Sequence, residues 1–117
     1  MNDYIVIFEK FSDYKNVVDC INELKTLCFY YETKQYDQMR DFIQRLISKH
    51  QLEALAWNLK HPVMPETFDQ LYINACDFMR VQTVKEISIA APNYLDLLTE
   101  SEKAVLDVLI RALEIDR

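Results

Sequence analysis

Few residues of this chain have the types and spacing that acid–base, nucleophilic or metal chemistry requires. The sequence has two histidines, His50 and His61, and three cysteines, Cys20, Cys28 and Cys76. Neither histidine belongs to an HExxH motif and no Glu stands three residues before a His, so the zinc-protease and di-iron bundle signatures are missing. We therefore expect no enzymatic activity, no cofactor and no metal. The alternative left open is a small helical enzyme in which His50 and His61 meet in the fold.

The three cysteines are predicted to pack rather than to react. A cysteine nucleophile needs a helix N-terminus or a nearby cation to lower its pKa. All three lie inside segments with helical periodicity, on or beside apolar stripes. Because their number is odd and no CxxC spacing occurs, we expect reduced and mostly buried thiols.

The complete absence of glycine excludes several classes of site. The chain has 117 residues and no glycine, whereas average usage of about 7% predicts roughly eight. Gly-rich phosphate loops, dinucleotide-binding turns and the glycine-bearing elbow of many hydrolases need positive φ or close backbone approach. None of these can be built here in standard form.

Composition and charge indicate a single acidic globular domain over residues 1–117. Half of the residues are hydrophobic, and the formal net charge is −6. Most of the excess lies in residues 61–117, which hold ten acidic and five basic side chains. Nucleic acid and anionic membranes need clustered cations, so we expect neither as a direct partner. No signal pattern or bilayer-length apolar run is found, which predicts a cytoplasmic location.

Hydrophobic periodicity predicts helices almost throughout the chain. They are expected over 12–33, 35–49, 51–60 and 65–80, then in a short segment ending at Pro92, and finally from residue 99 onward. Ser12 is the predicted N-cap of the first of these helices, and Pro65 suits the first position of the fourth. Capping boxes, Thr83 with Glu86 and Thr99 with Glu102, predict the last two starts. Residues 4–8 suit a strand or a helix, and the helix is favoured because no partner strand is evident. The predicted fold is all-α, a compact bundle of five to six helices joined by short turns without glycine.

Three aromatic residues are candidate anchors for a protein partner. Tyr30 falls on the polar side of its predicted helix, Tyr36 follows the next turn, and Trp57 is the only tryptophan. Aromatic side chains anchor interfaces because they bury a large area at little entropic cost.

The C-terminal segment supplies the remaining candidate residues. Its acidic side chains include Asp107, Glu114 and Asp116, which could steer a basic partner and speed its association. Its apolar surface covers about two-thirds of the predicted last helix. Ile110 extends that surface, so this helix is expected to be buried by the bundle or by a second copy of the chain.

These features predict a non-enzymatic protein-binding module. In its most concrete form it is a small acidic inhibitor, of the immunity or antitoxin type, that blocks a basic partner acting on nucleic acid. Carboxylates would then stand where substrate phosphates lie, and Tyr30 would supply a desolvated anchor. The alternative is a structural or adaptor protein that dimerises through its C-terminal helix.

Overall fold

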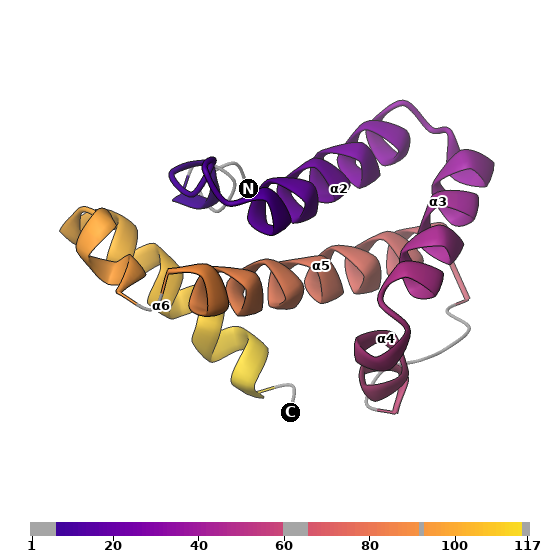
Figure 1. Ribbon diagram of the computed structural model, residues 1–117. Coiled ribbons are helices and arrows are strands. Elements are labelled where there is room, and N and C mark those ends of the chain that lie inside the picture. Colours follow the sequence, from indigo (N-terminus) through magenta and orange to yellow (C-terminus); the bar gives the residue numbers. More distant parts are fainter. Residues whose placement is uncertain (1–6, 60–65, 92, 116–117) are drawn as a thin grey trace. The chain divides into compact units, whose positions relative to one another are not determined.

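The computed structural model describes residues 7–59, 66–91 and 93–115, and at positions 94, 95 and 109–115 it describes the backbone only. Every regular element in these ranges is helical, so the predicted all-α fold is confirmed. After a helical turn at 7–9, the elements are α2 (Lys15–Glu32), α3 (Tyr36–Lys49), α4 (Gln51–Asn58), α5 (Phe68–Ala90), the 3-10 helix η1 (Tyr94–Leu97) and α6 (Glu100–Ile115) (Figure 1). None of these helices has the length and apolar content needed to cross a bilayer.

Internal contacts group the described residues into two compact units. Unit 1 contains the residues up to Asn22 together with those from Arg80 onward, and unit 2 contains the residues of Glu23–Met79. Helices α2 and α5 each contribute residues to both units. The single domain over 1–117 stays a prediction.

The core of unit 1 is apolar and draws on both ends of the chain. Ile7 and Phe8 are helical and buried, in agreement with the helix that was favoured over a strand for residues 4–8. Positions 4–6 lie outside the described residues. The cluster consists of Ile7, Phe8, Phe11, Val17, Ile21, Ile87, Ala91, Leu98 and Leu106.

The start of α2 differs from the prediction. Ser12 is not the N-cap, because the helix begins at Lys15 after a turn in which Tyr14 N–H donates to Phe11 O. Phe11 is fully buried in the core and Tyr14 packs against that core, with their rings 6.4 Å apart. Core packing therefore holds this turn in place of the local capping signal.

The predicted helix start at Thr83 and Glu86 is wrong. α5 continues without a break from Phe68 to Ala90, and Thr83 lies in its interior with none of its surface exposed. On the same helix, Ile87 lies in the core of unit 1 and Val84 packs against that core. A capping box requires orphan N–H groups at a helix terminus, and a continuous helix offers none at this point.

The starts of α5 and α6 are set by threonine caps. Thr99 N–H donates to Glu102 Oε1 over 2.9 Å and Glu102 N–H donates to Thr99 Oγ1 over 3.2 Å, so the predicted capping box of α6 is confirmed. At the start of α5, Gln70 N–H donates to Thr67 Oγ1 over 3.1 Å. Thr67 is therefore the N-cap that the sequence analysis missed, and Pro65 lies outside the described residues.

The turn between α2 and α3 shows how the chain manages without glycine. Lys34 has a φ of 59°, and it is the one described residue with positive φ. Gln35 N–H donates to Tyr30 O and Lys34 N–H donates to Tyr31 O, at 2.8 and 3.1 Å. This is the hydrogen-bond pattern of the Schellman motif, in which the left-handed position is usually glycine.

Candidate protein-binding surface

The short helix α4 packs one of its faces inside unit 2. Ala54 is buried, and Trp57 and Asn58 are partly buried. Trp57 Nε1 donates a hydrogen bond to Asn74 Oδ1 of α5 over 2.9 Å, and the Trp57 ring meets the Phe78 ring edge-on at 5.8 Å. Trp57 is thus a contact between α4 and α5 and not an isolated surface residue.

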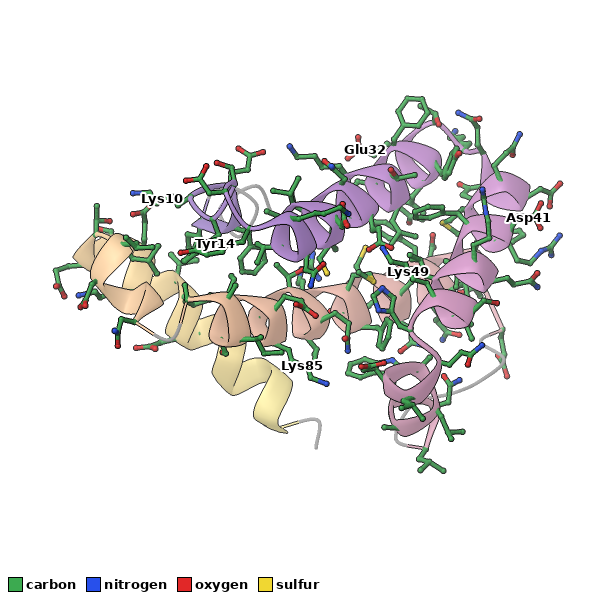
Figure 2. All side chains as sticks on the ribbon, in the orientation of Figure 1. Lys10, Tyr14, Glu32, Asp41, Lys49 and Lys85 are labelled. Carbon is green, nitrogen blue, oxygen red and sulfur yellow. The ribbon has the colours of Figure 1, made fainter. Side chains whose placement is uncertain are left out.

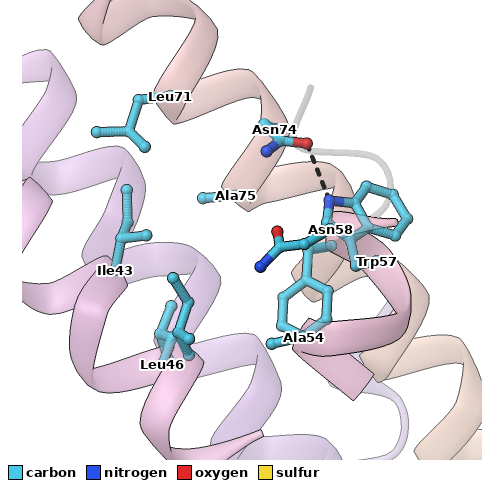
Figure 3. A pocket seen from close by; sticks show the side chains of 10 residues that line it. Ile43, Leu46, Ala54, Trp57, Asn58, Leu71, Asn74 and Ala75 are labelled. Carbon is cyan, nitrogen blue, oxygen red and sulfur yellow. Dashed lines mark hydrogen bonds between the residues drawn. The ribbon is translucent and has the colours of Figure 1, made fainter. Parts of the chain in front are cut away.

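This packed face borders an apolar pocket formed by three helices of unit 2. Figure 3 shows the side chains around it and the hydrogen bond from Trp57 to Asn74. The lining residues are Ile43, Leu46 and Ile47 from α3, Ala54, Trp57 and Asn58 from α4, and Leu71, Asn74, Ala75 and Phe78 from α5.

The opposite face of α4 is apolar as well, but it is exposed. Leu52, Leu55 and Leu59 expose 80%, 63% and 82% of their surface. At about 100° per residue these three positions fall within roughly 60° of one another, on the far side of the helix from Ala54 and Trp57. We call Leu52, Leu55 and Leu59 the leucine face; Ala56, also exposed, lies beside it. A helix that is apolar on two sides is typical of one that is covered on both.

A single residue joins α3 to α4 and so fixes where the leucine face begins. His50 N–H donates to Leu46 O over 2.9 Å, which ends α3, and His50 O accepts from Ala54 N–H over 2.7 Å, which begins α4. The helices therefore share His50 as their common cap.

The His50 side chain lies against α2 and α5 within unit 2. Its Nε2 is shielded from solvent, has no hydrogen-bond partner among the described residues and lies 3.6 Å from Glu23 Oε1. Lys49 Nζ lies 3.3 Å from the same oxygen (Figure 2 labels Lys49). The imidazole meets the Phe78 ring edge-on at 5.9 Å. These contacts make His50 a packing residue at the helix junction.

The predicted anchors Tyr30 and Tyr36 take part in ring contacts inside unit 2. Tyr30 meets Phe42 edge-on at 6.0 Å, and Tyr36 stacks on Phe68 at 4.9 Å with 8° between the ring planes. The Arg40 guanidinium lies 5.9 Å from the centre of the Phe68 ring. Both tyrosines are half-buried, so part of each ring is already used within the chain.

The predicted acidic residues are only partly described. Asp107 is exposed on α6. Glu114 and Ile110 lie within α6, but their side chains are outside the described part, and Asp116 is outside it altogether.

Glu102, by contrast, is engaged inside unit 1. Lys10 Nζ lies 2.8 Å from Glu102 Oε1. The hydrogen bond from Lys10, and after it the one from the Thr99 backbone, lower the pKa of Glu102.

The described residues contain no group of three His, Cys, Asp or Glu side chains that could hold a metal ion. His61 lies outside the described residues, so the pairing of His50 with His61 stays a prediction. Cys20 and Cys76 are buried, Cys28 is half-buried, and none of the three is in a disulfide.

The sequence predicted a helix over residues 51–60 and gave Trp57 as a separate candidate, but the leucine face was not among the predicted binding residues. Placing Trp57 on the same helical wheel would have shown that it lies opposite the leucines. That signal indicates two apolar faces on one short helix, of which only one can pack inside.

No protein-family model, no curated protein and no solved structure matches this chain.

Proposed function

We propose that this chain is a non-enzymatic protein-binding module that engages its partner through the leucine face of α4. The single observation that supports this is the exposure of Leu52, Leu55 and Leu59 on the side of α4 opposite its packed face. Leucine side chains carry no acid, base or nucleophile. The role we propose for these three is therefore to be buried against a partner protein.

The energetics favour a partner with a complementary apolar surface. Burying one leucine side chain contributes about 1.5–3 kcal/mol. Three neighbouring leucines therefore offer enough to act as the centre of a small interface. A helix on the partner with apolar residues at spacings of three and four would fit such a stripe.

The finer proposal is that the module is an acidic inhibitor of a basic, nucleic-acid-acting partner. The net charge of −6 and the exposed Asp107 support it. In this form the leucine face gives affinity, while the carboxylates increase the rate of association. A cytoplasmic location is part of the same proposal.

The second candidate is a homodimer formed through α6. Val108 on that helix exposes 59% of its surface, which favours a covered face there. The two candidates predict different effects of a polar substitution. On α4 it should weaken partner binding, and on α6 it should weaken the dimer.

Partner capture with matched variants distinguishes them. We compare the wild-type chain, Leu55→Glu/Leu59→Glu and Ile89→Glu as baits in extract from the native host, and then measure the affinity of each bait for the purified partner. Ile89 is the control because it exposes 65% of its surface and lies on α5 in unit 1. Glutamate suits an exposed helix position, so neither variant should disturb the fold.

The double leucine variant should bind at least about 30-fold more weakly, since one interface hot spot contributes about 2 kcal/mol or more. Ile89→Glu should bind as the wild type does. Equal affinity of all three baits would refute the proposal. A concentration-dependent dimer in light scattering that Val108→Glu abolishes, with no dependence on the leucines, would establish the second candidate in its place.

A further inference from the structure

Two cysteines of unit 2 lie at one phenol hydroxyl. Cys28 Sγ of α2 and Tyr72 Oη of α5 share a hydrogen bond of 3.0 Å. Cys76 follows Tyr72 by one helical turn on the same face of α5. The pKa of Tyr72 is raised, first by burial, then by the Cys28 hydrogen bond and further by Cys76. Cys28 and Cys76 therefore lie on either side of the contact between α2 and α5 at Tyr72.

The register of α2 against α5 within this unit supports the same arrangement. The rings of Tyr31 and Tyr72 stack at 3.9 Å with 2° between their planes, and the Tyr31 hydroxyl donates to Asp69. A step back along α2 from Tyr31 to Cys28 thus corresponds to a step forward along α5 from Asp69 to Tyr72. The two segments run antiparallel. Because Tyr31 contacts both Asp69 and Tyr72, the turn of α2 that holds Cys28 faces α5 between Tyr72 and Cys76.

We propose that Cys28 and Cys76 form an oxidation site, at which a peroxide converts the two thiols into a disulfide that links α2 to α5. This goes beyond the proposed binding function and does not depend on it. Cys28 is half-buried and can be reached by a small oxidant, whereas Cys76 is only 2% exposed. Cys28 is thus the thiol attacked first, and Cys76 is the one that completes the bond.

The chemistry balances with hydrogen peroxide as the only co-reactant. The Cys28 thiolate attacks one peroxide oxygen, the O–O bond breaks, and a sulfenic acid and one water form after proton transfer. The Cys76 thiolate then attacks the Cys28 sulfur and displaces a second water. Two thiols lose two electrons and two protons in total, and one peroxide is reduced to two waters.

The test uses the intact chain with hydrogen peroxide as the probe. The protein is oxidised, remaining thiols are alkylated, and the non-reduced chain is digested with trypsin. Cleavage after Lys or Arg places Cys20, Cys28 and Cys76 on three separate peptides, which are 16–25, 26–34 and 61–80. We expect a cross-linked species of 26–34 with 61–80 that is two hydrogens lighter than the sum and disappears on reduction.

Matched variants make the result specific. Cys20→Ser should keep the cross-link, because Cys20 belongs to unit 1. Cys28→Ser and Cys76→Ser should each abolish it, and Tyr72→Phe should keep it because the phenol oxygen is not part of the bond. The proposal is overturned if Cys28 and Cys76 both stay open to alkylation after peroxide, or if they reach sulfinic acid without the cross-link. It is equally overturned if Cys20 is the main partner of either thiol.

Discussion

Trp57 Nε1 donates a hydrogen bond to Asn74 Oδ1 over 2.9 Å, and this bond ties α4 to the first part of α5. It also decides which side of α4 faces outward, because Trp57 lies on the helix opposite the leucine face. Trp57, a predicted anchor for a partner, is thus also a packing contact within unit 2.

Trp57→Phe should lower the free energy of unfolding by about 1–3 kcal/mol, since it removes the donor to Asn74 and part of the buried ring. Urea denaturation of the wild type, Trp57→Phe, Asn74→Ala and the double variant gives the coupling between the two residues. The double variant should lose less than the sum of the single losses. Strict additivity would show that the hydrogen bond does not stabilise α4.

Lys34→Gly should raise the free energy of unfolding by about 1 kcal/mol. Lys34 has a φ of 59°, and an L-residue with a Cβ atom is strained in this region whereas glycine is not. Lys34→Ala is the matched control, because alanine keeps the Cβ atom and should bring no such gain. Equal stability of the glycine and alanine variants in urea would contradict this explanation.

Glu102→Gln should destabilise the chain at neutral pH and have no effect in acid. The hydrogen bond from Lys10 lowers the pKa of Glu102 below its usual value of 4.5 in the folded chain. The stabilisation is therefore complete above pH 4.5 and is lost as the pH falls through the lower, folded-state pKa. Glutamine still accepts the Thr99 N–H bond of the capping box, so the variant isolates the charge.

The measurement is the melting temperature of Glu102→Gln and the wild type across that pH range. Glu100→Gln is the control, because Glu100 lies in the same turn and is 93% exposed, with Lys103 Nζ 3.3 Å from its Oε1. It should change the melting temperature little, since exposed pairs contribute little. A difference at Glu102 that persists unchanged into acid would show that its charge is not the stabilising feature.

Asp107→Lys should slow association with a basic partner severalfold at low salt and reduce the salt dependence of the rate. The reason is that an exposed carboxylate acts through long-range attraction while the complex forms. Stopped-flow mixing with the purified partner measures this rate, with Asp13→Lys as a control that makes the same charge change elsewhere on the exposed surface. The same slowing in both variants would indicate net charge rather than a steering site, and unchanged rates would remove the steering idea.

Much of the fold follows from local pattern. The helix predicted over 35–49 corresponds to α3, which buries Met39, Ile43 and Leu46 at helical spacing. The Thr99 and Glu102 box predicted the start of α6 because its two hydrogen bonds close within a single turn. Such features depend on residues three or four positions apart, so the sequence alone carries them.

The features that the sequence analysis missed depend on distant contacts. Thr83 and Glu86 have the pattern of a capping box, but the packing of Val84 and Ile87 in the core continues the helix through them. Periodicity also identifies the apolar positions of α4, but it does not show which of them pack inside the chain. Only the contacts of Trp57 with Asn74 and Phe78 decide that the leucine face is the outer one.

The most direct test of the leucine face as a docking surface is hydroxyl-radical footprinting of the chain alone and in complex with its captured partner. Oxidation at Leu52, Leu55 and Leu59 should fall severalfold on binding, while Ile89 and Leu97, which are exposed apolar residues of unit 1, should react as before. If the three leucines are oxidised at the same rate in the free chain and in the complex, the partner does not cover α4, and the account of this surface is wrong.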